Sequence, residues 1–275
     1  TIPRPPKNPK ATYFWGETPM KQCSTDFLSL HSENPPRNFP IVENIYTRNG
    51  MQSWRDTRTG AVYRVGNYSF SFYTTADTDD SQEVLNVAVS QDGRPTASIN
   101  LPTAFGGTGA FGVYFMGEDA VPTLVVASYA GGAHCCTGYA FLPLTPEPSE
   151  VSVAGSFDGD YFDLWDIDRD GSFELARPDI RFPRAIGPNL DLWAPPIIYA
   201  LKDGAIHDAT SADRYKPFLR EEIERISQQC GPIGGWAIGA CEGWAATAWR
   251  LGEYEAAMST IAQRFAAAPK NTTMG

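Results

Sequence analysis

The 275-residue chain lacks the features that would direct it to nucleic acid or into a membrane. Only 22 Lys and Arg oppose 32 Asp and Glu, which gives a net charge of −10 at pH 7. Such a field repels phosphate backbones and anionic lipid. No apolar run approaches the roughly 20 residues of a membrane-spanning helix, and the longest candidates, such as 124–127, are strand-sized. We therefore expect no nucleic-acid partner and no membrane span.

Cysteine and histidine are also scarce. Three histidines leave few nitrogen ligands for a transition metal, and five cysteines are too few for a small disulfide scaffold but enough for two bridges and a spare thiol. The chain begins at Thr1 and shows no charged segment followed by an apolar one. This start is expected of a mature protein after removal of a signal peptide, and it is equally expected of a trimmed chain. We expect an extracytoplasmic protein, either periplasmic or secreted. The cysteines are Cys23, Cys135, Cys136, Cys230 and Cys241.

Proline and β-forming residues divide the first three quarters of the chain. Proline is dense in "TIPRPPKNP" and "SENPPRNFP", where it removes backbone donors and favours extended conformations. We predict an extended arm over 1–58. From 59 to 209, short segments rich in β-branched and aromatic residues alternate with Gly, Asp and Pro, and Asp92-Gly93 marks a hairpin. This pattern predicts an antiparallel β meander with a partial propeller-like body.

The last part of the chain changes to helical periodicity. Tyr215, Leu219, Ile223 and Ile226 recur at steps of three or four residues, which predicts a helix that is firm from about 216 and is capped by the hydroxyl of residue 210 or 211. Further helical patterns follow over 235–251 and 253–268. The expected fold class is mainly β with a C-terminal α-helical cap, 210–268, of two or three helices.

One segment has the spacing of a metal site. "DLWDIDRDGSFEL" places Asp166, Asp168 and Asp170 at alternate positions, and Gly171 then permits a sharp turn toward Glu174. Carboxylates held this close repel one another unless a hard cation neutralises them, and oxygen ligands suit calcium. We predict a calcium loop over 166–174.

The residues around the loop separate two calcium families. An EF-hand needs a bidentate Glu at loop position twelve and helices on both sides, whereas Arg177 stands there and the flanks have strand character. The segment instead resembles the calcium loops of FG-GAP and VCBS-type repeats, as in integrin-α propellers. The resemblance implies that Asp166, Asp168, Asp170 and Glu174 are side-chain ligands and Ser172 a carbonyl ligand of Ca²⁺. A lanthanide ion would fit the same ligands.

The stretch "SYAGGAHCCTG" raises a second possibility for chemistry. Neighbouring side chains on extended backbone point to opposite faces, so His134, Cys135 and Cys136 do not suit a structural zinc ion. We predict structural pairing, either between the two adjacent cysteines or of one of them with Cys23. The alternative is an activated thiol beside His134. "GGAHCC" together with the calcium loop resembles a pairing found in uncharacterised secreted bacterial proteins, for which no activity is implied.

The expected function follows from these features. The chain has no hydrolase elbow, Walker loop, dinucleotide fingerprint or HExxH pair. We expect a secreted, calcium-stabilised, β-rich binding or assembly module without catalytic activity, with a protein or glycan partner. The alternative is an extracytoplasmic enzyme, either thiol-dependent at residues 134–136 or a glycan hydrolase with paired carboxylates such as Asp160 and Asp163. A disulfide between Cys230 and Cys241 is expected to link two helices.

Overall fold

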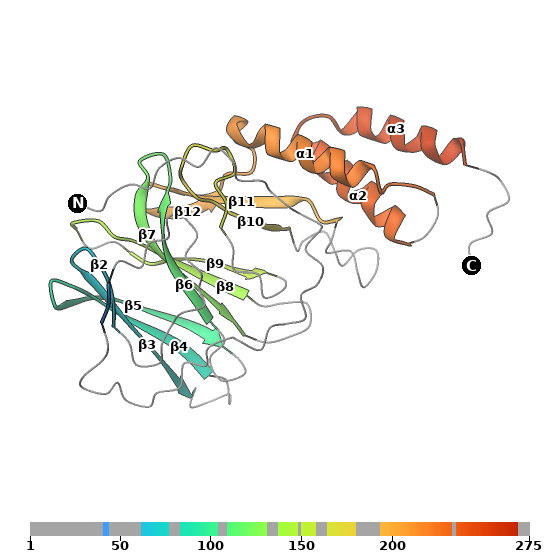
Figure 1. Ribbon diagram of the computed structural model, residues 1–275. Coiled ribbons are helices and arrows are strands. Elements are labelled where there is room, and N and C mark those ends of the chain that lie inside the picture. The colour runs from blue at the N-terminus through green and yellow to red at the C-terminus, as the bar shows by residue number, and fades with distance from the viewer. Residues whose placement is uncertain are drawn as a thin grey trace. The chain divides into compact units, whose positions relative to one another are not determined.

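The computed structural model describes residues 41–43, 62–76, 83–103, 109–130, 137–147, 150–157, 164–179, 193–232 and 235–268. Three sheets, which are mainly antiparallel, are followed by three C-terminal helices (Figure 1). This confirms the predicted fold class. The chain forms two compact units, one of Thr1–Glu174 with Ala200–His207 and one of Leu175–Tyr199 with Asp208–Gly275.

The first unit begins with a five-stranded sheet in the order β1-β2-β3-β4-β5. The strand β1 pairs parallel to β2, and the other neighbours are antiparallel. The predicted hairpin at Asp92-Gly93 is confirmed, because this dipeptide joins β4 to β5 with φ values of 51° and 76°, the left-handed pair that a type I′ turn requires. The strands are β1 (Ile41–Glu43), β2 (Val62–Val65), β3 (Tyr68–Ala76), β4 (Glu83–Gln91) and β5 (Arg94–Thr103).

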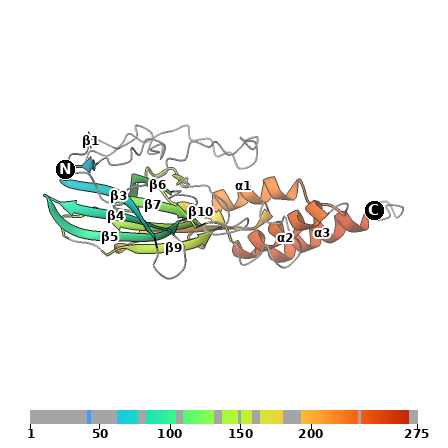
Figure 2. The same cartoon turned by 90° about the horizontal axis from the view of Figure 1, so that it is seen from below.

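A four-stranded sheet in the order β6-β7-β8-β9 completes the core of this unit (Figure 2). Alternate apolar residues of both sheets share one buried cluster. At its centre the ring of Phe111 lies 4.7 Å from that of Tyr63 and 4.2 Å from that of Phe72, measured between ring centroids. The strands are β6 (Gly109–Met116), β7 (Val121–Tyr129), β8 (Thr137–Pro143) and β9 (Ser152–Phe157).

A third sheet has the order β10-β11-β12, with strands β10 (Leu175–Pro178), β11 (Pro196–Lys202) and β12 (Ala205–Asp208). The expected side-chain cap of the first helix is wrong. The hydroxyl of Thr210 instead accepts the N–H of Ile198 at 2.8 Å and donates to Asp208 at 2.5 Å. A 3-10 turn, Asp213–Tyr215, intervenes, so Tyr215 is the N-cap and has no side-chain hydrogen bond of its own to the helix end.

The helices are α1 (Lys216–Ser227), α2 (Gly235–Arg250) and α3 (Tyr254–Ala266). The start of α1 agrees with the predicted position. Between α1 and α2 the structure contains the expected disulfide, Cys230–Cys241, with its Cα atoms 4.6 Å apart. Both cysteines belong to a small apolar core with Ile226, Ala240 and Trp244, so the bridge lies inside the contact between the two helices.

Two polar contacts attach the helices to neighbouring backbone within the second unit. Arg264 on α3 donates to the carbonyl oxygens of Ser227 and Cys230, where α1 ends, and its guanidinium lies 4.9 Å from the ring centroid of Trp244. A cation at a helix C-terminus is favourable because the last carbonyls lack intrahelical donors.

Among the described residues, no helix combines the length and hydropathy needed to cross a bilayer.

The C-terminal end of α2 is fixed by a buried ion pair. Arg250 donates to the carboxylate of Asp179 and to the carbonyl of Pro196, and Asp179 is only 2% exposed. About two turns earlier, Gly243 passes so close to the backbone of Trp193 that a Cβ atom would overlap its carbonyl oxygen. Glycine here serves close approach rather than a left-handed turn.

Candidate metal centre

The predicted loop is closed at its base by an antiparallel bridge. Trp165 donates to the carbonyl of Glu174 at 2.8 Å, and Glu174 donates to the carbonyl of Trp165 at 2.7 Å. The strand β10 starts at the next residue. The loop is thus held by extended backbone on both sides of its base, which agrees with the exclusion of an EF-hand, where helices flank the loop.

The neighbouring hairpin supports the far side of the loop. The N–H of Phe173 donates to the carbonyl of Phe115 in β6 at 2.7 Å, and the hydroxyl of Ser172 donates to the carbonyl of Gly117 at 2.8 Å. Ser172 is buried. These contacts join residues 58 and 55 positions apart in sequence, and they fix the loop against the four-stranded sheet.

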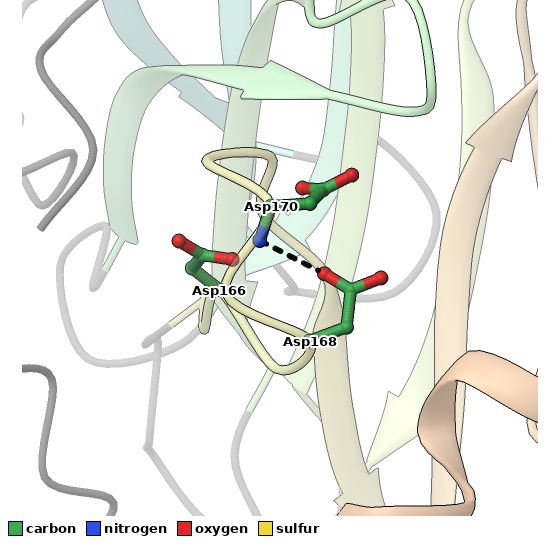
Figure 3. Close-up of side chains that lie close together, drawn as sticks. All are labelled: Asp166, Asp168 and Asp170. Carbon is green, nitrogen blue, oxygen red and sulfur yellow. Dashed lines mark hydrogen bonds between the residues drawn. The ribbon is translucent and has the colours of Figure 1, made fainter. Parts of the chain in front are cut away.

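The three aspartates shape the loop through their own hydrogen bonds (Figure 3). Asp168 accepts the N–H of Asp170 at 3.3 Å, and Asp170 accepts the N–H of Ser172 at 2.7 Å. Asp166 reaches further and accepts the N–H of Gly171 at 3.1 Å. Short bonds of this kind from Asp to the backbone two residues ahead are typical of tight turns. They curl the chain so that the three carboxylates come together.

The backbone of the loop takes two left-handed residues to make this curl. Arg169 has a φ of 63° and Gly171 a φ of 91°. Glycine adopts this region without steric penalty, whereas Arg169 adopts it at a cost that the surrounding bonds offset. The side chain of Arg169 is exposed. The predicted role of Gly171 as the turning residue agrees with its φ.

The carboxylates converge. One oxygen from each of Asp166, Asp168 and Asp170 lies within 4.8 Å of the others, so this cluster could hold a metal ion. Glu174 is not part of that cluster, but it lies close enough for all three aspartates to raise its pKa. The donors are all oxygen, the chemistry that hard cations such as Ca²⁺ prefer.

Glu174 is a buried acid with a strongly perturbed pKa. It is 2% exposed, and burial together with repulsion by the three aspartates raises its pKa to about 9, against the lowering effect of a hydrogen bond from the N–H of Ile167 at 3.0 Å. Burial likewise raises the pKa of Asp166, and the charge of Asp170 adds to this rise. Both pKa rises thus come from burial and from the charges of neighbouring aspartates.

Asp166 provides the observation that tests the fit of an ion. One carboxylate oxygen accepts the N–H of Gly171, while the other, Oδ1, is buried with no hydrogen-bond partner. A buried carboxylate oxygen without a partner is costly. An ion among the three aspartates would satisfy it, so the residues present fit a divalent cation.

The remaining sequence-predicted residues differ in what the structure shows of them. Ser172 lies in the loop as expected, held by its amide and hydroxyl. The candidates for thiol and glycan chemistry lie outside the described residues, as does the third cysteine considered for pairing. They are His134, Cys135, Cys136, Asp160, Asp163 and Cys23.

Sequence reasoning missed the residues that support the loop. Phe115 and Gly117 lie in and after β6 and carry no motif, so no local signal identifies them. Trp165 could have been found, because "DLW" and "FEL" frame the loop at equal distances from its centre, as two strands closing a hairpin do. Glu174 is the other member of that bridge.

Comparisons with known proteins give partial and distant matches. The chain is 27% identical over 118 residues to the probable thylakoid lumen protein sll0997 of Synechocystis sp. The aligned region covers 42% of this chain and 35% of that protein. It is 30% identical over 104 residues to the uncharacterized protein y4bJ of Sinorhizobium fredii. This aligned region covers 38% of this chain and 16% of that protein. The matches therefore span well under half of either relative. No family model matches, and no solved structure matches.

Proposed function

We propose that this chain is an extracytoplasmic, calcium-stabilised, β-rich module without catalytic activity that binds or assembles with a protein or glycan partner. The observation that carries the proposal is the convergence of the carboxylates of Asp166, Asp168 and Asp170. One oxygen of this cluster, Oδ1 of Asp166, is buried without a hydrogen-bond partner, and the buried Glu174 lies next to the cluster. Without a cation, four acidic groups are held together at a cost to the folded state.

Calcium is the cation that these ligands favour. Three aspartates, Glu174 and the carbonyl of Ser172 would supply at least five oxygens, and Ca²⁺ takes six to eight in irregular geometry. Mg²⁺ keeps several waters and uses one or two carboxylates. The loop connects two strand segments, as the FG-GAP and VCBS-type loops that it resembles do. The role of the ion is to hold the loop against β6, a structural contribution to the fold.

An oxidising compartment is supported by two independent observations. The helices carry the disulfide Cys230–Cys241, and such bridges persist mainly outside the cytosol. A distant relative is described as a probable thylakoid lumen protein. We place this chain in the periplasm or outside the cell, where calcium is also more available than in the cytosol.

The test is direct titration of the metal-free protein. Trp165 adjoins Asp166 in sequence, so excitation of tryptophan should sensitise the luminescence of Tb³⁺ bound in the loop, and excess Ca²⁺ should quench it by competition. Calcium at a hundred times its dissociation constant should add about 2.7 kcal/mol of stability, visible as a higher melting temperature.

A matched pair of variants distinguishes metal binding by the loop from a general effect of removing one acidic side chain. Asp168→Ala should abolish both the terbium signal and the calcium response. Asp119→Ala removes an exposed aspartate from the nearby β6–β7 turn and should leave both unchanged. Equal responses of the two variants, or an unchanged melting temperature of the wild type on addition of chelator or calcium, would refute the proposal.

A further inference from the structure

Most of the large apolar side chains that are exposed in the described part of the chain lie close together in the sequence. Of the five large apolar side chains that are exposed among the described residues, four lie between 249 and 265. Trp249 is in the last turn of α2, and the others are on α3. Their exposed fractions are 67% for Trp249, 40% for Tyr254, 38% for Met258 and 40% for Phe265. Exposed apolar groups that gather in this way mark interaction surfaces.

The residues on α3 form a single stripe. At about 100° per residue, positions 254, 258, 261 and 265 fall within about 60° of one another around the helix. Ile261 is half-buried and packs on the core between the helices, so the stripe runs along the edge of that core. We call Tyr254, Met258, Ile261 and Phe265 the α3 stripe.

The α3 stripe is free of charge, although the chain as a whole is strongly acidic. The helix contains one acidic and one basic residue, Glu255 and Arg264. Arg264 is engaged with the end of α1 and with Trp244. A neutral face on a chain of net charge −10 is the place where a second, equally acidic copy can approach with least repulsion.

The intervals between the residues of the α3 stripe are the same when read in either direction along the helix. Its members are separated by four, three and four residues, a pattern that reads the same in both directions about a centre between 259 and 260. When two copies of α3 pack antiparallel about a two-fold axis there, Tyr254 meets Phe265 of the second copy and Met258 meets its Ile261. A two-fold interface requires this kind of reciprocal pairing.

The available area sets the strength of such a contact. An aromatic side chain presents about 150–250 Å², so the exposed fractions of Tyr254, Met258 and Phe265 amount to roughly 200–250 Å² of apolar surface per copy. Two copies would bury roughly 400–500 Å² from these side chains, well below the approximately 1,200–2,000 Å² of stable interfaces. The contact therefore suits a weak and reversible association.

We propose that the α3 stripe mediates weak, two-fold self-association of this protein. The occupant of the exposed face is the α3 stripe of a second copy in antiparallel orientation. Because the contact is apolar and the copies repel through their net charge, added salt should strengthen it by screening the repulsion.

Sedimentation velocity on the full chain tests this proposal, from low micromolar to several hundred micromolar protein and at two salt concentrations. The wild type should shift from monomer toward dimer as concentration rises, and more so in high salt. Met258→Glu puts a charge at the centre of the stripe and should weaken dimerisation by at least about tenfold, because a charge cannot be buried unpaired. Phe265→Ser should weaken it at the ends of the stripe without adding charge.

Gln263→Glu is the matched control. Gln263 is exposed on the side of α3 opposite the stripe, so the same added charge there should leave dimerisation at the wild-type level. Circular dichroism on all variants checks that the helices are retained. The proposal is overturned if the wild type stays monomeric throughout, if both charge variants dimerise alike, or if dimerisation weakens with salt. A monomeric wild type that binds neutral phosphatidylcholine vesicles through Met258 would assign the stripe to a lipid surface instead.

Discussion

Replacement of Glu174 by Gln should stabilise the metal-free protein at alkaline pH and remove its response to calcium. The buried carboxyl has a pKa of about 9 in the folded chain against 4.5 ordinarily. At about 1.4 kcal/mol per pKa unit, this difference sets an upper bound of roughly 6 kcal/mol. Because the folded pKa is the higher one, the protonated carboxyl contributes its stability fully below about pH 4.5, and this contribution is lost as the pH rises through about 9.

The sign of this linkage gives a clear comparison. Metal-free wild type should lose stability between pH 5 and pH 9 relative to Glu174→Gln, by several kcal/mol at most. The glutamine oxygen can still accept the N–H of Ile167, which bonds to the carboxylate at 3.0 Å in the wild type. Calcium should offset the loss in the wild type, because the cation neutralises the ionised carboxylates.

Urea unfolding at several pH values, with chelator and with calcium, measures these differences directly. Subtracting the free energy of unfolding of the variant from that of the wild type cancels the contributions of the other titrating groups, because the two proteins share all of them. Parallel stability curves for the two proteins without calcium would refute the argument, and so would a wild type that is more stable than the variant at pH 8. An undiminished calcium response in Glu174→Gln would remove this residue from the ligand set.

Three further changes test the second unit. Cys230→Ser with Cys241→Ser should lower the free energy of unfolding by about 3 kcal/mol, the value for closing a loop of this length, as measured by urea denaturation beside the reduced wild type. Arg250→Met should cost about 3–5 kcal/mol because it leaves the buried Asp179 carboxylate without its cation; adding Asp179→Leu should recover part of the loss, and no recovery would contradict the assignment. Gly243→Ala should lower the melting temperature, although alanine favours helices by about 1 kcal/mol, because the new methyl would overlap a carbonyl oxygen; a higher melting temperature would show that the backbone yields there.

The parts of this fold that follow from local chemistry could be predicted from the sequence. Asp92-Gly93 supplies a turn of known geometry, the alternation around Phe70 and Phe72 sets which face of β3 is buried, and Pro217 fixes the start of α1 because proline is tolerated in the first turn. The spacing of the aspartates likewise predicted their convergence, since the turn bonds that produce it join residues two to five positions apart.

The parts that depend on distant contacts could not be predicted. The hydroxyl of Thr210 stood at a plausible cap position, but it satisfies the N–H of Ile198 twelve residues earlier. The support of the loop by Gly117 comes from 55 residues away, and nothing in the hairpin sequence of β6 and β7 indicates that its carbonyls are used. The depth at which Glu174 is buried is a property of this packing, so its pKa could not be inferred from the motif.

The path of the chain between the two units limits how the protein can be dissected. The backbone passes from one unit to the other after Glu174, returns at Ala200 and leaves again after His207, so no single cut yields two complete fragments. A recombinant fragment that ends at Glu174 would lack the hairpin β11–β12, and one that starts at Leu175 would carry its tip as a foreign segment. A circular permutant or a split-protein pair would need new termini at a position other than the boundary after Glu174. The Asp203-Gly204 turn is suited to new termini because a Cβ at Gly204 would meet nothing within 4 Å.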